Sequence, residues 1–290
     1  MNYKTEDLIK IYDSNNNEVP WQLNRFPDGQ VQTVWTPTTE EFRLVGCVTD
    51  PDSFLAFLEL WCSRLSSIGI TYLYGARSDK LYDAPVGSPN LPFNLGTELT
   101  FPSCLLLLTL LVSREQSCPT TVLDPHCNEL IQKEFPELQV VHSFPFSAEE
   151  LGDRYGLVVY PDESAQRRYQ PQLGANPFLT CEKVRDQSTG RITGHTLLCG
   201  WPKCFREAQQ ILVVDDICDG GATFISVAEL LKEAGIYGKL DLSITHGVFS
   251  KGVNELLKHY NRIYVTDSHP GAWHYRETER ILIRPVWNLV

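Results

Sequence analysis

The stretch that most constrains this chain runs from Ile211 to Thr223. It opens with four apolar residues, three of them β-branched, which predict a buried strand. Two adjacent carboxylates, Asp215 and Asp216, come next, and a turn of small residues follows them. Residues 224–234 then show helical spacing, with Gly235 as the predicted C-cap. This order predicts an α/β fold with the turn at the carboxyl end of a strand, where open α/β sheets bind ligands.

A turn of this kind can direct backbone N–H groups at an anion, and the positive end of the following helix strengthens the attraction. The stretch therefore indicates a site for a negatively charged group beside two carboxylates. By itself it does not separate a kinase from a transferase.

The length and composition limit the number of domains and the kinds of partner. A chain of 290 residues favours two domains, and a composition shift near 143–150 places them at 1–145 and 146–290. With 42% hydrophobic and 21% charged residues, the composition is ordinary for a globular protein. The net charge of −11, without a long basic run, argues against a nucleic-acid partner.

The cysteines and the N-terminus predict a cytoplasmic protein. The nine cysteines are scattered, no two have the spacing of a zinc site, and reduced thiols are the simplest interpretation. The first residues lack the basic and apolar regions of a signal peptide. The most apolar run, 104–112, is too short to cross a membrane and predicts a buried helix, so no membrane partner is expected.

Strands and helices alternate along the chain, which predicts mostly parallel sheets flanked by helices in both domains. A helix is predicted from residue 50 to about Leu65, and a strand from 182 to 186 running into a mobile loop, 186–194. Further strands are predicted at 8–12, 18–23, 31–35, 44–48, 69–74, 120–123, 138–142, 157–160, 239–245 and 262–266, and a further helix at 99–112.

Polar residues follow several strand ends, and each group has a plain structural interpretation beside the functional one. Spacing alone favours a hairpin connection for residues 25–30. It also favours a solvated loop over an anion-binding site for residues 77–79. His126, beside an aspartate at a strand end, is either structural or a metal ligand. Lys183 and Arg185 are either surface charges or part of a lid that brings cations to a phosphate.

Taken in order, these elements resemble the ribose-phosphate pyrophosphokinase family, which makes phosphoribosyl pyrophosphate. The similarity covers nearly the whole chain and is diluted in 36–70 and 84–118. Single elements are weak, but five occur in the family's order and approximate spacing. The resemblance implies an N-terminal ATP-binding domain and a C-terminal domain of the type I phosphoribosyltransferase-like fold.

The resemblance also implies roles for individual residues. The 215–223 stretch is similar to the family's loop Asp-Asp-x-x-Asp-Thr-[Ala/Gly]-Gly-Thr, so Asp215 and Asp216 are expected to hold ribose hydroxyls. The 5-phosphate would lie on Asp219, Gly220, Gly221, Ala222 and Thr223. Lys183 and Arg185 match a flexible catalytic loop, His126 and Asp162 match the Mg²⁺ positions, and Phe26, Asp28, Gln30, Arg77, Ser78 and Asp79 match the ATP contacts.

The implied reaction transfers diphosphate from ATP to the 1-hydroxyl of ribose 5-phosphate, with Mg²⁺ as cofactor. A homo-oligomer, dimer or hexamer, is implied because the family's first ATP segment reaches a neighbouring subunit. Three departures stand out: Gly220 replaces a threonine, Gln30 a glutamate and Ser78 a glutamine.

The departures fit a divergent member, and a phage-type member is one interpretation. The hydroxyl lost at Gly220 makes ADP-ribose a second possible acceptor, as in NAD salvage. Two further hypotheses are a phosphoribosyltransferase, which shares the acidic pair and the turn, and a non-catalytic partner subunit that keeps the fold. The retained Lys183, Arg185, His126 and Asp162 argue against the non-catalytic subunit.

Overall fold

The computed structural model describes ten segments of the chain, and they form two compact units. The first unit comprises residues 1–141 with 289–290, and the second comprises 142–288. The described residues are 3–27, 31–60, 65–73, 118–126, 128–142, 154–174, 176–185, 192–197, 203–276 and 278–290.

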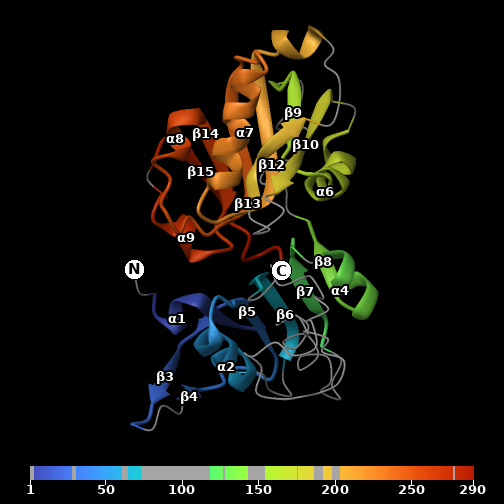
Figure 1. Ribbon diagram of the computed structural model, residues 1–290. Coiled ribbons are helices and arrows are strands. Elements are labelled where there is room, and N and C mark those ends of the chain that lie inside the picture. Colours follow the sequence, from blue (N-terminus) through green and yellow to red (C-terminus); the bar gives the residue numbers. More distant parts are fainter. Residues whose placement is uncertain are drawn as a thin grey trace, which may run out of the picture. The chain divides into compact units, whose positions relative to one another are not determined.

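The first unit is built on a six-stranded sheet in the order β2-β1-β5-β6-β7-β8. β5 to β8 pair in parallel, and β1 pairs antiparallel to β5. β3 and β4 form a separate antiparallel ribbon (Figure 1). The elements are α1 Thr5–Leu8, β1 Ile9–Asp13, β2 Glu18–Val19, β3 Trp21–Arg25, β4 Val31–Trp35, β5 Phe42–Cys47, α2 Pro51–Leu60, β6 Leu65–Tyr72, β7 Thr120–Leu123, α4 Asn128–Glu134 and β8 Gln139–Val141.

Close packing of α2 and of the C-terminal residue holds this sheet. A Cβ on Gly46 would lie 2.5 Å from the Phe57 ring, so only glycine lets α2 approach β5 this closely. A Cβ on Gly69 would similarly meet the Val290 backbone at 2.7 Å, and Arg43 Nη1 donates to the Val290 carbonyl at 3.2 Å. The end of the chain is therefore part of the first unit.

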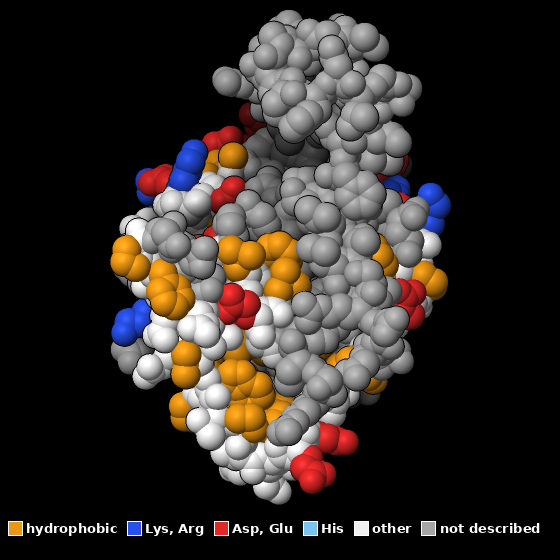
Figure 2. Space-filling model, turned by 90° about the horizontal axis from the view of Figure 1, so that it is seen from below, with side chains coloured by type: hydrophobic (Ala, Val, Ile, Leu, Met, Phe, Trp, Pro, Cys, Tyr) orange, Lys and Arg blue, Asp and Glu red, His pale blue; other side chains and the backbone are white. Residues whose placement is uncertain are grey.

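The surface of the first unit carries scattered apolar side chains. Figure 2 shows apolar groups lying between polar ones on one face of the molecule. The exposed large apolar residues of this unit include Phe26, Val34 and Leu55. Singly exposed apolar side chains are ordinary on protein surfaces.

The second unit contains a seven-stranded sheet in the order β11-β10-β9-β12-β13-β14-β15. All strands of this sheet except β11 pair in parallel, and β11 pairs antiparallel to β10 at one edge. The elements are β9 Leu157–Tyr160, α6 Glu163–Leu173, β10 Phe178–Arg185, β11 Ile192–Leu197, the 3₁₀ helix η2 Lys203–Glu207, β12 Gln210–Cys218, α7 Ala222–Glu233, β13 Lys239–Gly247, α8 Leu256–His259, β14 Arg262–Thr266, α9 Pro270–Trp273 and β15 Ile281–Arg284.

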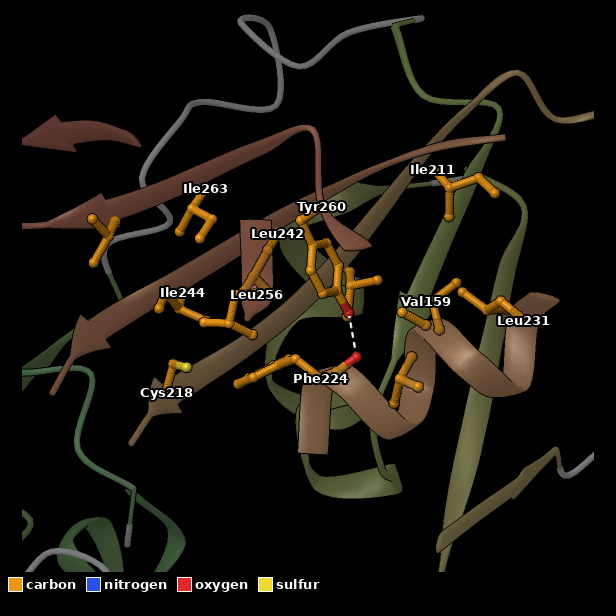
Figure 3. Close-up of a cluster of buried hydrophobic side chains, with 14 of the residues drawn as sticks. Val159, Ile211, Cys218, Phe224, Leu231, Leu242, Ile244, Leu256, Tyr260 and Ile263 are labelled. Carbon is orange, nitrogen blue, oxygen red and sulfur yellow. Dashed lines mark hydrogen bonds between the residues drawn. The ribbon is translucent and has the colours of Figure 1, made fainter. Parts of the chain in front are cut away.

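The central strand β12 is buried on both faces. Ile211 and Val213 belong to one apolar cluster with α7 and α8, whereas Leu212 and Val214 belong to another with α6. Parallel strands covered on both faces have continuous apolar runs, which explains the sequence of β12. In the first cluster the Tyr260 hydroxyl donates to the Phe224 carbonyl at 2.8 Å, which satisfies a buried polar group (Figure 3).

The predicted fold class is confirmed, since both sheets are mostly parallel and flanked by helices. Several local boundaries were predicted wrongly, and the strand expected at 69–74 is β6, which begins at Leu65. The helix predicted to about Leu65 cannot extend that far, because Leu65 begins β6 and pairs with Phe42. The loop predicted at 186–194 overlaps β11, which begins at Ile192.

The helix predicted at 99–112 lies outside the described residues. Among the described helices none has both the length and the apolarity needed to span a membrane.

Candidate active site at the carboxyl edge of the second sheet

The predicted sugar-binding residues lie at the carboxyl end of β12. Because β9, β10, β12 and β13 are parallel, their carboxyl ends meet at one edge of the sheet. Asp162 follows β9 at this edge, and Asp215 and Asp216 lie near the end of β12. Asp219 lies in the connection to α7. The structure thus brings these carboxylates to the same edge of the second unit.

The two adjacent aspartates are not equivalent. Asp216 is 4% exposed, and its Oδ2 accepts a hydrogen bond from Arg168 Nη1 at 2.7 Å. Asp215 is half-buried, and its Oδ1 accepts from the Asp216 backbone N–H at 2.9 Å. One carboxylate of the pair is therefore held by a buried cation, while the other braces the backbone between them.

The turn after the pair has the geometry that its glycines predict. Gly221 has φ +80°, in the left-handed region that favours glycine, and stands directly before α7. A Cβ there would meet the Leu256 side chain at 3.1 Å. Gly221, the N-cap of α7, has no side chain that could accept from the first-turn N–H groups, whereas most helix starts have a polar N-cap. The positive end of α7 is thus available to an anion.

Lys251 lies against this turn. Its methylene groups would be 3.4–3.7 Å from a Cβ on Gly220, and its side chain is exposed. In the part of the chain that the structure describes, Lys251 forms no ion pair. The cation stands beside the one position of the loop where the family's usual threonine is missing.

Asp162 already has a structural role. It is the N-cap of α6, and its Oδ1 accepts from the Ala165 N–H at 2.9 Å. An ionised carboxylate has several acceptor positions on its two oxygens, so the cap leaves capacity for a further ligand. Mg²⁺ commonly binds proteins through one or two carboxylates together with substrate phosphates. The chemistry of a carboxylate suits the predicted role of Asp162 at Mg²⁺, and that role stays a prediction.

His126, the other predicted Mg²⁺ ligand, belongs to the first unit. It follows β7 and is half-buried, two residues after the buried Asp124. Within the described ranges, no group of three or more His, Cys, Asp and Glu side chains is arranged to hold a metal. The pairing of His126 with Asp162 stays a prediction.

The structure describes only some of the remaining predicted site residues. Phe26 lies just after β3 and is 47% exposed. Lys183 and Arg185 lie in β10 and not in a loop, because their backbone pairs with β11, Lys183 opposite His195. Asp28, Gln30, Arg77, Ser78 and Asp79 lie outside the described residues.

Sequence reasoning assigned no role to Arg168, although a signal was present. The buried face of α6 includes Ala165 and Tyr169, and Arg168 occupies the same face by helical spacing. A cation on a buried face requires a partner, because an unpaired buried charge is costly. The missing information was the identity of that partner, Asp216.

A second missed feature is a histidine pair beside the turn, of which His246 is buried and His269 half-buried. His246 Nδ1 shares a hydrogen bond with the Ser268 hydroxyl at 2.8 Å. Burial, reinforced by nearby His246, lowers the pKa of His269 to about 4. His269 is also the N-cap of α9, where its Nδ1 accepts from the Gly271 N–H at 3.0 Å. A neutral imidazole is thus required for this cap.

Comparisons with known proteins bear on the family. No family model matches the chain. The chain is 29% identical over 137 residues to ribose-phosphate pyrophosphokinase 3, chloroplastic, of Oryza sativa subsp. japonica. This match covers 42% of this chain and 30% of that protein. The chain is 31% identical over 125 residues to ribose-phosphate pyrophosphokinase of Thermococcus kodakarensis, covering 42% and 41% respectively.

The chain resembles ribose-phosphate pyrophosphokinases. The resemblance predicted from the motifs is confirmed, and the matches span less than half the length of either curated relative.

The fold agrees over a longer stretch. The crystal structure of phosphoribosylpyrophosphate synthetase from Mycobacterium smegmatis aligns with 95% of this chain and 89% of its own, with a TM-score of 0.71 and 16% identity. At this identity the likeness establishes a shared fold and no more.

Proposed function

We propose that this protein is an ATP-dependent transferase that moves the β,γ-diphosphate of ATP to the 1-hydroxyl of ribose 5-phosphate and releases AMP. The observation that carries the proposal is the β12–α7 junction. There, an acidic pair near the end of β12 is followed, after residues 217–220, by the left-handed Gly221 and a helix whose N-cap has no side chain. The similarity to ribose-phosphate pyrophosphokinases supports it.

The junction suits a phosphorylated ribose. Carboxylates accept hydrogen bonds from sugar hydroxyls, and Asp215 and Asp216 supply them at the strand end. The backbone N–H groups of the turn and the positive end of α7 attract the 5-phosphate, with Gly221 allowing the close approach. These contacts fix the ring and leave the 1-hydroxyl as the reacting group.

In the reaction the 1-hydroxyl oxygen forms a bond to the β-phosphorus of ATP. The bond from that phosphorus to the oxygen bridging to the α-phosphate breaks, AMP leaves, and the hydroxyl proton passes to solvent. Transfers of this kind depend on positioning and charge neutralisation more than on covalent catalysis. Mg²⁺, when bound at His126 and Asp162, would neutralise the ATP phosphates.

The ATP side of the site is proposed from the resemblance. Lys183 and Arg185 would stabilise charge that develops on the transferred group, and loss of one such stabiliser costs about 2.7–4 kcal/mol in other enzymes. The adenine nucleotide would contact two segments of the first unit, Phe26 to Gln30 and Arg77 to Asp79. We also propose a homo-oligomer, which sedimentation analysis would test.

ADP-ribose is the second candidate acceptor, with the same chemistry at its terminal ribose. The loop lacks one hydroxyl at Gly220, which reduces the hydrogen bonds available to a free phosphate monoester. Both relatives described above are named for ribose-phosphate, so ribose 5-phosphate stands first.

One assay tests the proposal. The protein is incubated with Mg-ATP and either ribose 5-phosphate or ADP-ribose, and AMP is followed by chromatography. We expect AMP with ribose 5-phosphate. AMP with ADP-ribose alone would reverse the order of the acceptors, and AMP with neither would exclude the transferase and favour a phosphoribosyltransferase or a non-catalytic subunit.

A further inference from the structure

The ion pair between Arg168 and Asp216 joins two parts of the second unit that the proposed reaction uses. Asp216 lies at the carboxyl end of β12, within the predicted sugar site. Arg168 lies on α6, the helix that Asp162 caps. The N–O distance is 2.7 Å, and the two side chains are only 8% and 5% exposed.

Because the ion pair is buried, it restricts the orientation of the Asp216 carboxylate. A hydrogen bond between charged groups is stronger where water is excluded, and the planar guanidinium is rigid and always charged. The neighbouring residue offers a contrast on the same helix, since Arg167 and Glu163 are 3.9 Å apart with side chains 59% and 69% exposed. Such surface pairs restrict their side chains little.

A carboxylate held in one orientation before its ligand arrives loses less freedom on binding. This preorganisation favours the ligand, since ordering of side chains is a cost of association. The ion pair also connects α6 to β12. It therefore helps to fix the distance between Asp162, at the start of α6, and Asp216 within the second unit.

We infer that Arg168 is a positioning residue for the acceptor sugar. It holds Asp216 in the orientation in which the carboxylate receives ribose hydroxyls. This inference rests on the proposed function, and it adds a residue outside the predicted loop to the acceptor site.

The test compares one substitution at neighbouring positions of α6, Arg168→Met and Arg167→Met. KM values are measured for ribose 5-phosphate and ATP, and ribose 5-phosphate binding is measured by calorimetry without ATP. Loss of a hydrogen bond between charged groups predicts a rise of about tenfold or more in the ribose 5-phosphate KM and Kd for Arg168→Met. The ATP KM should stay near the wild-type value, and Arg167→Met should behave as wild type.

A double-mutant cycle asks whether Arg168 acts through Asp216. In an Asp216→Asn background, Arg168→Met should add little further loss, because the carboxylate that it orients is gone. An undiminished further loss would overturn the inference. Arg168→Lys keeps a cation and should recover part of the affinity, and it carries the comparison if Arg168→Met does not fold.

The outcomes separate the inference from the proposed function. Equal acceptor KM values for Arg168→Met and Arg167→Met, in an enzyme whose wild type releases AMP, overturn the inference alone. The same variants are measured with ADP-ribose, whose terminal ribose presents the same ring. If the wild type neither binds nor converts either acceptor, the proposed function fails and the inference fails with it.

Discussion

The starts of α6 and α7 lie at the same edge of one sheet and are built in opposite ways. Both helices follow a central parallel strand, β9 or β12. α6 begins with Asp162, whose side chain accepts from the Ala165 N–H. α7 begins with Gly221 in the left-handed region and has no side-chain cap. The first start is capped by a side chain of the helix's own N-cap residue, whereas the second lacks such a cap, and there we propose that an anionic ligand binds.

The difference separates stability from binding within one site. A capped start contributes to folding whether or not substrate is present, typically about 1 kcal/mol. Gly221 has no side chain that could accept from the first-turn N–H groups, and it adopts the left-handed conformation without strain. α9 is a third case, because its cap, His269, can be titrated. Four experiments test this comparison.

The largest effect is expected from lowering the pH across the titration of His269. Its pKa falls from 6.5 to about 4 on folding, so the folded protein keeps the imidazole neutral while the unfolded chain takes up a proton. The neutral imidazole contributes fully to the free energy of unfolding above pH 6.5. As the pH falls this contribution is lost, and the free energy of unfolding is lower by about 3 kcal/mol at pH 4. Urea unfolding at several pH values measures the loss.

His269→Asn is the matched variant for that experiment. Asparagine keeps an oxygen that can accept from the Gly271 N–H but does not titrate in this range. The variant should therefore show a shallower decline in unfolding free energy between pH 6.5 and 4. Identical declines in the two proteins would show that other groups cause it.

Gly221→Ala tests the uncapped start, with Gly174→Ala as its control. Both glycines have positive φ, +80° and +66°, so each alanine should cost roughly 1–2 kcal/mol of stability. Only at Gly221 does the new methyl group meet a neighbour, Leu256, at the proposed phosphate site. Gly221→Ala should also raise the acceptor KM, and a similar rise for Gly174→Ala would show an indirect effect.

Asp162 allows its two roles to be separated. Asp162→Ala should destabilise the protein by about 1 kcal/mol in thermal or urea unfolding, whereas Asp162→Ser should preserve most of the stability because serine is also an N-cap. Both variants should need more Mg²⁺ for half-maximal activity, since both lack the carboxylate. If the serine variant has a normal Mg²⁺ response, Asp162 is a helix cap and not a metal ligand.

The smallest effect is expected at Lys251. Lys251→Met removes a cation beside Gly220 and should raise the acceptor KM about two- to fivefold, the effect of losing one exposed ion pair with the proposed phosphate. Lys258→Met is the control, because Lys258 is an exposed lysine paired with Glu255 at 2.7 Å. Stability should change little in either variant. A larger effect at Lys258 would remove Lys251 from the site.

Local sequence predicted much of the fold. The strands expected at 31–35, 120–123, 157–160 and 262–266 coincide with β4, β7, β9 and β14. Each is a short run rich in β-branched or aromatic residues, and such a run favours a strand. The start of β6 was predicted wrongly because local sequence favoured a helix there. Leu65 and the residues before it continue an apolar period compatible with a helix, and pairing with β5 decided otherwise.

The site divides in the same way. The acidic pair, the turn and the helix that follows are contiguous, so their order and spacing revealed them together. Arg168 was visible as a charge on the buried face of α6, but its partner lies 48 residues away along the chain. Lys251 likewise reaches Gly220 from the connection after β13.

The sequence by itself determined the order of most strands and which chemical groups lie near their carboxyl ends, because hydrophobic period and turn residues act over a few neighbouring positions. Only the tertiary structure decided that Arg168 holds Asp216 and not Asp215, and that Lys251 lies beside Gly220. Such distinctions depend on contacts between distant segments and on burial, which packing creates and local sequence does not specify.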